Sequence, residues 1–478
     1  MKKVLFALLF LVGFAEAFAA DGYKVQVKFT DVKNAPVYLA NYYGQAFPSI
    51  FKADSATLDA NGVATFISSQ KIIGGIYIII LADGKSYFEF LLQNGDDMGI
   101  DVTASQLPDG VKFRNTADNA RFATYLAAVK AYGSVQQNSS NELAKAKTKA
   151  DSAAAIDRLT LAGRKVNEFR VEQMTKYPGS LLASIFKAME TPAVPPGKHY
   201  LPDGQEDTAF AYRYYKAHYW DKFNFKDDRL VYTPLYDSKL EYYFTNLVDP
   251  TPDSLQKEAA ILLEKTRGHK EIFKYTLWWL TQRTQYSGIM GMDQAFVYLV
   301  ENYYMKGDAY WLTKDYLDGY IDRARKIAPN VIGNQGADIK MVDMEKRPFS
   351  LYDFNAKYTL IVFWSPECGG CREQLPLVDS VYRAALKDKG VRVVAVRTEG
   401  DEGKWKEFVT KKNLRDWAHI YDPERKSNYR AKYDVYGTPI IYLLDREKII
   451  RGKKLDYTNI AAVVEMLEEK ENATKKKL

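Results

Sequence analysis

Cysteine is scarce in this chain of 478 residues: only Cys368 and Cys371 occur, three positions apart. A bridge between them would close a very short loop and restrict the unfolded chain little, so a purely structural staple explains the pair poorly. Histidine is also scarce, and the four histidines are not paired at the spacing of metal ligands. Because a structural zinc site takes four ligands, usually Cys or His, the sequence predicts no metal site and no bound cofactor.

A large excess of one sign of charge is missing as well. Lys and Arg number 67 against 60 Asp and Glu, which gives a formal net charge of +7. Outside the tail of three lysines at residues 475–477, the basic residues are interleaved with acids. This pattern is typical of a solvated surface, and it excludes a nucleic-acid footprint. We therefore expect no nucleic-acid partner.

Long apolar runs are missing after the first 20 residues, so we expect no stable membrane insertion. The N-terminus, MKKVLFALLFLVGFAEAFAA, has two lysines, an apolar run over residues 4–14, and small residues in A-x-A spacing. This layout predicts a secretory signal peptide over residues 1–19. An uncleaved anchor is the alternative, but the run is far shorter than the roughly 20 residues that span a bilayer. No cysteine lies near the cleavage site, which excludes a lipid-anchored lipoprotein, and we expect a soluble, exported mature protein.

The remaining sequence divides into three regions of different texture. Residues 20–115 show short β-rich runs separated by Asn-Gly and Asp-Gly turns, which predict a small antiparallel β domain of the sandwich kind. Residues 116–328 lack strand alternation and carry helical spacing with matching start and stop signals, which predicts a mainly α-helical domain. In residues 329–478 strand and helix patterns alternate, which predicts an α/β sheet with helices on its faces.

The helical region is rich in aromatic residues, most densely in AYRYYKAHYWDKFNF at residues 211–225. Tyr212, Tyr215 and Tyr219 fall on one face of a helix there. They can pack between helices, with their hydroxyls reaching polar partners at the edges. They can also form a groove for a partner polypeptide, because exposed tyrosine is a common interface anchor. The sequence leaves both explanations open.

The cysteine pair lies in WSPECGGC, where the first predicted strand of the last region passes into a helix. A thiol must be deprotonated to attack a disulfide, and a helix N-terminus stabilises the thiolate. Cys368 has that position. Cys371 lies one turn further on, where it can attack a mixed disulfide and release the substrate. The pattern therefore indicates a reactive pair.

FWSPECGGC, with Pro376 after it and VYGTPI at residues 435–440 much later, resembles the thioredoxin superfamily. The resemblance implies that Cys368 is the nucleophile, Cys371 the resolving thiol, and Pro439 a cis-proline that presents backbone to substrate. It also implies substrate contacts for Thr438 and for Trp364, the platform aromatic. The lead-in over residues 332–364 looks like the TlpA and ResA branch of exported thioredoxin-like proteins.

The first two regions resemble uncharacterised domains that precede such a module in envelope proteins of some Gram-negative bacteria. This implies a location in the periplasm or cell envelope, with protein thiols and disulfides as substrates and an electron donor in the envelope. The first two regions carry no chemistry that the resemblance can transfer.

The chain departs from the family pattern around the cysteines. The spacer is Gly369-Gly370, the residue before the nucleophile is Glu367, and Val362 stands where thioredoxin carries a buried acid. An acid beside the nucleophile disfavours its thiolate, and no basic side chain lies between the cysteines. Both features favour a reductant with a reduction potential of about −270 mV over a strong oxidant with a potential of about −120 mV. In the ResA branch a glutamate after the second core strand assists the resolving thiol. Glu399 lies in that neighbourhood, and a solvated loop acid is the alternative.

The sequence thus predicts an exported thiol-disulfide oxidoreductase that reduces protein substrates. A thiol peroxidase of the peroxiredoxin type is an alternative, since Ser365 precedes Cys368 at S-x-x-C spacing, although the proline expected four residues before Ser365 is Ile361. A second alternative is an envelope protein whose first two domains capture a partner, with redox chemistry secondary. The length of those two domains supports this partner-binding alternative.

Overall fold

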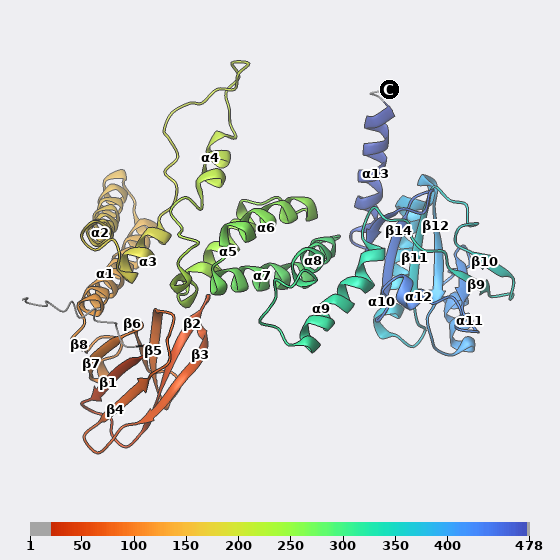
Figure 1. Cartoon of the computed structure of the whole chain (residues 1–478). Coiled ribbons are helices and arrows are strands. Elements are labelled where there is room, and N and C mark those ends of the chain that lie inside the picture. The colour runs from red at the N-terminus through yellow and green to blue at the C-terminus, as the bar shows by residue number, and fades with distance from the viewer. Residues whose placement is uncertain (1–20, 476–478) are drawn as a thin grey trace, which may run out of the picture. The chain divides into compact units, whose positions relative to one another are not determined.

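The structure is a computed structural model that describes residues 21–475, so the predicted signal peptide lies outside the described residues. The chain forms two compact units: one comprises the chain up to Leu247 with Thr266–Tyr275, and the other comprises Val248–Lys265 with the chain from Thr276 onward. Figure 1 shows the β strands of the first unit, the helices of the middle region, and the mixed sheet of the C-terminal region. The predicted fold class is confirmed, and the three-domain division stays a prediction.

Two four-stranded sheets make up the β region, in the orders β4-β1-β7-β8 and β3-β2-β5-β6. Side chains from both sheets, such as Val27 and Ile79, join in one buried core. β1 has strict alternation of buried and exposed residues, as expected for a strand with one face on that core. The strands are β1 Tyr23–Phe29, β2 Pro36–Tyr43, β3 Gln45–Thr57, β4 Val63–Ser68, β5 Gly75–Leu81, β6 Tyr87–Leu92, β7 Asp96–Val102 and β8 Val111–Arg114.

The prediction of antiparallel pairing is wrong for one pair of strands in this region. β1 and β7 run parallel, with Tyr23 opposite Asp96 and Phe29 opposite Val102. The turn signals in the sequence report only local hairpins, whereas this pair joins strands that lie far apart in the chain. All other strand pairs of the two sheets are antiparallel.

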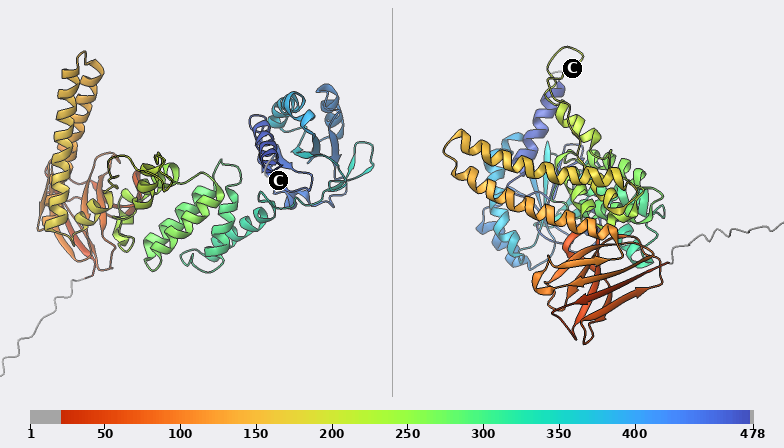
Figure 2. Two further views of the ribbon diagram at one scale, coloured as in Figure 1. Left: turned by 90° about the horizontal axis from the view of Figure 1, so that it is seen from above. Right: turned by 90° about the vertical axis from the view of Figure 1, so that its left-hand side faces the viewer.

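The middle region is helical, as predicted. α1 and α2 form a long hairpin whose two helices lie side by side in both views of Figure 2. Thr116 and Thr148 each cap the next helix by accepting a hydrogen bond from a backbone N–H three residues on. The helices are α1 Ala117–Lys145, α2 Lys149–Lys176, α3 Leu181–Met189, α4 Phe210–His218, α5 Leu235–Asn246, α6 Pro252–Thr266, α7 Lys270–Gln285, α8 Asp293–Leu299 and α9 Lys314–Ile327.

The C-terminal region is built on a seven-stranded mixed sheet of order β10-β9-β13-β12-β11-β14-β15. β11 is fully buried because helices and loops cover both sheet faces: Val362 faces one core and Phe363 the other. The strands are β9 Lys340–Asp343, β10 Pro348–Ser350, β11 Tyr358–Trp364, β12 Val391–Arg397, β13 Ala418–Tyr421, β14 Ile440–Leu444 and β15 Ile450–Lys453. The helices are α10 Gly369–Val381, α11 Glu402–Lys411, α12 Tyr429–Lys432 and α13 Ile460–Lys475.

Two ion pairs join the helices α8 and α9 to this sheet within the second unit. Lys453 of β15 is 2% exposed, and its ammonium lies 2.8 Å from the carboxylate of Asp293. Arg323 of α9 donates two hydrogen bonds, of 2.6 and 2.8 Å, to the carboxylate of Asp434. Asp434 lies in the segment that leads to Thr438 and Pro439. The helices before residue 329 therefore contribute counter-charges to the sheet that carries the cysteines.

Candidate active site at the cysteine pair

The central strand β11 delivers the cysteine pair to the start of a helix. Cys368 is the N-cap of α10, and its sulfur accepts a hydrogen bond of 3.1 Å from the N–H of Cys371. This replaces the oxygen of an ordinary capping residue with a thiol sulfur. The free N–H groups and dipole at a helix N-terminus favour negative charge, so the first turn of α10 stabilises a thiolate at Cys368.

The two thiols differ in access to solvent. Both are free thiols in the structure, but Cys368 is partly exposed and Cys371 is fully buried. A substrate disulfide can therefore reach Cys368 first, and it meets Cys371 only through Cys368. This difference fits the predicted order of nucleophile and resolving thiol.

The segment from Val435 to Ile440 completes the site opposite the helix. The peptide bond from Thr438 to Pro439 is cis. The Cys368 thiol donates to the carbonyl oxygen of Thr438 at 3.3 Å. A Cβ atom on Gly369 would meet nothing within 4 Å, and one on Gly370 would meet only the Pro439 ring, at 4.0 Å. The structure thus brings together Cys368, Cys371, Thr438 and Pro439 around an open surface.

The environment separates the pKa values of the two thiols. Burial opposes ionisation of Cys368, but hydrogen bonds from the Cys371 thiol and from the N–H groups of Gly370 and Cys371 outweigh it, and the pKa of Cys368 falls below its ordinary value. Burial raises the pKa of Cys371 to about 12, and the neighbouring Cys368 adds to this rise. At neutral pH Cys371 is therefore a protonated thiol that can donate to the Cys368 thiolate.

Trp364 lies beneath the site and has no exposed surface. Its ring packs 5.1 Å from that of Phe408, and its carbonyl oxygen accepts hydrogen bonds from the N–H and the hydroxyl of Thr398, at 2.9 and 3.1 Å. The resemblance implies a substrate contact for this residue, which stays a prediction; in the structure its side chain is fully buried.

Glu399 follows β12 in the loop that runs beside the cysteine motif. The next residue, Gly400, has φ +98°, and a Cβ there would lie 2.9 Å from the Pro366 ring. The Glu399 carboxylate is 67% exposed and accepts a hydrogen bond of 3.2 Å from Arg430. The structure therefore brings Glu399 near the motif but directs its carboxylate to Arg430, and a role as assisting acid stays a prediction.

One charged neighbour of the site escapes sequence reasoning. Lys404, at the start of α11, lies with its ammonium 3.1 Å from the carboxylate of Glu367, and both side chains are more than half exposed. Lys404 stands 37 positions after Glu367, so only the fold brings the two charges together. The acid beside the nucleophile thus has a counter-charge that the local sequence does not contain.

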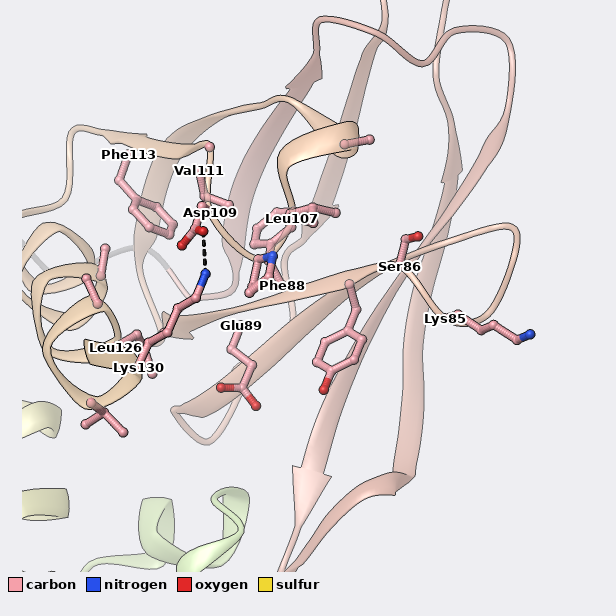
Figure 3. Close-up of a pocket in the computed structure, with 17 residues that line it drawn as sticks. Lys85, Ser86, Phe88, Glu89, Leu107, Asp109, Val111, Phe113, Leu126 and Lys130 are labelled. Carbon is pink, nitrogen blue, oxygen red and sulfur yellow. Dashed lines mark hydrogen bonds and ion pairs between the residues drawn. The ribbon is translucent and has the colours of Figure 1, made fainter. Parts of the chain in front are cut away.

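A cavity that is lined by neither cysteine lies in the first unit. Its volume is about 820 Å³, and it lies between β6, the segment around Leu107 and the start of α1. Figure 3 shows Leu107, Val111, Phe113 and Leu126 around it, with the ion pair of Lys130 and Asp109 at one side. All of its lining residues belong to the first unit, whereas the cysteine pair belongs to the second.

Within residues 21–475 no group of three or more His, Cys, Asp or Glu side chains is placed to hold a metal ion. None of the helices described combines the length and apolarity needed to cross a bilayer.

Comparison with known proteins gives matches to the C-terminal region. Residues 332–453 match the AhpC/TSA family. The chain is 26% identical over 141 residues to the thiol-disulfide oxidoreductase ResA of Bacillus cereus, a match that covers 29% of this chain and 78% of ResA. It is 28% identical over 124 residues to the thioredoxin-like protein YneN of Bacillus subtilis, which covers 25% of this chain and 68% of YneN.

Solved structures are also similar to parts of the chain. A thioredoxin-like protein from Bacteroides caccae is 19% identical, with a TM-score of 0.45, 58% of this chain covered and 98% of that chain. The thioredoxin domain of a thiol-disulfide oxidoreductase from Bacteroides vulgatus is 29% identical, with a TM-score of 0.27, 29% of this chain covered and 97% of that chain. The predicted resemblance is confirmed for residues 332–453: the C-terminal region of the chain is a thioredoxin-like domain of the AhpC/TSA family, related to enzymes named thiol-disulfide oxidoreductases.

Proposed function

We propose that the protein is an exported thiol-disulfide oxidoreductase that reduces disulfides of protein substrates through Cys368 and Cys371. The observation that carries the proposal is the partly exposed Cys368 sulfur at the N-terminus of α10, which accepts a hydrogen bond from the Cys371 N–H and faces the Thr438 carbonyl. A partly exposed nucleophile with a buried second thiol one turn away has the geometry that disulfide exchange requires.

In the proposed reaction, the Cys368 thiolate attacks one sulfur of a substrate disulfide. The substrate S–S bond breaks, a mixed disulfide forms at Cys368, and the other substrate sulfur leaves as a thiolate that takes up a proton. Cys371 then loses its proton and attacks the sulfur of Cys368, which releases the second substrate thiolate. Two electrons pass to the substrate, and the enzyme is left with a Cys368–Cys371 disulfide that an electron donor in the envelope reduces again.

The loss of the Cys371 proton is the demanding step, because its pKa is about 12 in the reduced enzyme. We keep Glu399 as the candidate acceptor of that proton, reached by rotation of its exposed side chain away from Arg430. Glu399→Gln should then slow release of substrate from the mixed disulfide and leave its formation unchanged. Stopped-flow measurement of the two steps checks this, and equal rates in the variant and the natural protein would assign Glu399 to the surface.

The direction of electron flow is supported by the residues around the pair. Glu367 precedes the nucleophile and no base lies between the cysteines, and both features destabilise the reduced, thiolate form that makes a strong oxidant. Lys404 offsets part of the Glu367 charge, so the reduction potential is the measurement that decides. Equilibration with glutathione should give a value near about −270 mV, and one near about −120 mV would make the protein an oxidant.

Insulin reduction tests the activity itself. The full chain with a thiol donor should accelerate precipitation of the insulin B chain, and Cys368→Ser should abolish the acceleration. Cys371→Ser should accumulate a stable mixed disulfide, whose mass identifies the substrate when the variant is expressed in its native host. Rapid consumption of peroxide without a protein substrate, together with no insulin reduction, would instead favour the thiol peroxidase that the S-x-x-C spacing allows.

Export is supported by the N-terminal pattern of lysines, apolar run and small residues. Fractionation of cells and N-terminal sequencing of the mature protein check it. We expect the mature chain to begin directly after residue 19 and to be recovered from the periplasm.

A further inference from the structure

A buried lysine lies at the centre of the tyrosine-rich segment of the first unit. Lys239, on α5, is 6% exposed. Its ammonium lies 4.5 Å from the centre of the Tyr219 ring and 5.8 Å from that of Trp220. Aromatic faces attract a cation in this geometry, so the two rings compensate part of the cost of burying it.

No acidic side chain within residues 21–475 pairs with this cation. In the described part of the chain, the Lys239 ammonium has neither an ion pair nor a hydrogen bond to a protein oxygen. The other deeply buried lysines differ. Lys453 has the carboxylate of Asp293 at 2.8 Å, and Lys448 donates to the carbonyl oxygen of Phe354 and the hydroxyl of Thr359. Because an unpaired buried charge is costly, an ammonium held without an anion is suited to receive one.

A cavity opens onto Lys239 from the space between α4 and α5. Its volume is about 320 Å³, and its walls include the rings of Tyr215 and Tyr242 and the side chain of Leu235. A neighbouring cavity of about 300 Å³ shares Met189 and Thr191 with it. That second cavity is lined by Arg170, whose buried Nε has no hydrogen-bond partner within the described residues. Two cationic side chains, Lys239 and Arg170, thus line adjoining cavities. The walls of the cavity at Lys239 are largely apolar, whereas those of the cavity at Arg170 are mostly polar.

We propose that the cavity at Lys239 binds a small organic anion, a carboxylate on an aromatic or aliphatic body, with the carboxylate on the Lys239 ammonium and the body against the tyrosine rings. The volume is at the lower end of the range for ligand pockets, which matches a ligand of about one ring. A cationic ligand is excluded because the lysine already occupies the ring faces. This site is independent of the cysteine chemistry, and its failure would leave the proposed oxidoreductase function untouched.

The test compares 4-phenylbutyrate with its uncharged amide, 4-phenylbutyramide, on the full chain by isothermal titration calorimetry. The carboxylate should bind at least about tenfold more tightly than the amide, since a hydrogen bond to a charged group contributes about that factor. Lys239→Met, which keeps the length and apolar stem of the side chain, should reduce binding of the carboxylate to the level of the amide. Lys222→Met, at an exposed lysine of the same segment, should leave both affinities unchanged.

A pH series in the natural protein keeps the proposal testable if Lys239→Met does not fold. Burial lowers the pKa of Lys239 to about 8. The other titratable groups that face the cavities are Tyr215, Tyr219 and Tyr242, with Glu190 and Arg170 in the second one. Affinity for the carboxylate should fall as pH rises from 7 to about 9, while that for the amide stays constant. Equal binding of both probes, no binding of the carboxylate, or binding that survives Lys239→Met would overturn the proposal.

Discussion

The pKa values of the two thiols in the motif shift in opposite directions because the fold gives the thiols different surroundings. Cys368 receives hydrogen bonds at the mouth of a helix, whereas Cys371 is enclosed in the core beside Leu375 and Trp364. The pKa of Cys368 is lowered and that of Cys371 is raised to about 12. At neutral pH the reduced enzyme therefore presents the Cys368 sulfur to solvent as its nucleophile, while the Cys371 sulfur stays protonated.

Alkylation follows this difference. Iodoacetamide at pH 7 should label Cys368 and leave Cys371 unlabelled, because each unit of pKa changes the thiolate fraction about tenfold and only thiolates react. Mass spectrometry of the modified peptides measures the two rates, which should differ by at least about 100-fold. The single variants Cys368→Ser and Cys371→Ser serve as controls for peptide assignment, and similar rates at the two positions would contradict the separation.

Some site residues could be predicted from the sequence and some could not. The sequence motifs around the two cysteines and the VYGTPI segment predict the roles of Cys368, Cys371 and Pro439, and the structure places these residues together. Lys404 could not be predicted, because its contact with Glu367 depends on where α11 packs. The burial of Trp364 was hidden too, since an aromatic at a strand end can face either solvent or core.

At the scale of elements, α9 supports the segment that faces the nucleophile. Asp434 has φ +51°, a left-handed conformation that is uncommon outside glycine, and its carboxylate is held by both terminal nitrogens of Arg323. Four residues after Asp434 the chain reaches Thr438, whose carbonyl oxygen accepts a hydrogen bond from the Cys368 thiol. Arg323 thus acts on the site by fixing the backbone that leads to it.

Arg323→Met should lower both stability and activity. The variant leaves the Asp434 carboxylate, 6% exposed, without its partner, which should reduce the free energy of unfolding by about 1–3 kcal/mol. Thermal unfolding and insulin reduction measure the two effects. Arg325→Met is the matched control: its pair with Asp322 is 3.9 Å long and mostly exposed, so it should stay within about 0.5 kcal/mol. Equal effects of the two variants would show that Arg323 is an ordinary surface residue.

The elements themselves were predicted best where their pattern was strong. The mostly apolar, fully buried strand β11 and the helix after the cysteines follow the sequence closely. The sequence pattern gives little indication of β13, because AHIY is short and contains His419. This polar residue is buried in the core, where its ring forms a hydrogen bond with the Leu414 carbonyl. The parallel pairing of β1 with β7 was missed because it depends on contacts far apart in the chain.

At the scale of the molecule, the second unit is larger than the region that matches the AhpC/TSA family. It includes α6, α8 and α9 as well as the sheet, and the Lys453–Asp293 pair lies between them. A fragment of residues 329–478 lacks Asp293 and Arg323. It therefore keeps Lys453 and Asp434, whose side chains are largely buried, without the partners that neutralise their charges. Its fold therefore lacks two contacts that the full chain supplies.

A fragment of residues 248–478 should be more stable than one of residues 329–478. Breaking a buried ion pair costs several kcal/mol, and 1 kcal/mol corresponds to about 2–4 °C in a domain of this size. We expect a melting temperature at least about 5 °C higher for the longer fragment by differential scanning calorimetry. Asp293→Asn in the longer fragment should remove part of the gain, and equal melting temperatures of the two fragments would assign the helices no share in the stability.

The Lys453–Asp293 pair also bears on how such chains can recombine. If the redox domain were transferred to another protein with its boundary near residue 332, it would contain the buried ammonium of Lys453 but would lack the carboxylate of Asp293 that pairs with it. A chimera that exchanges this domain between relatives should therefore function only if the segment from α8 onward moves with it, or if position 453 is made apolar at the same time. The segment that can be exchanged as one piece should therefore begin in the helices, at Asp293 of α8, which is 47 residues before β9 begins at Lys340.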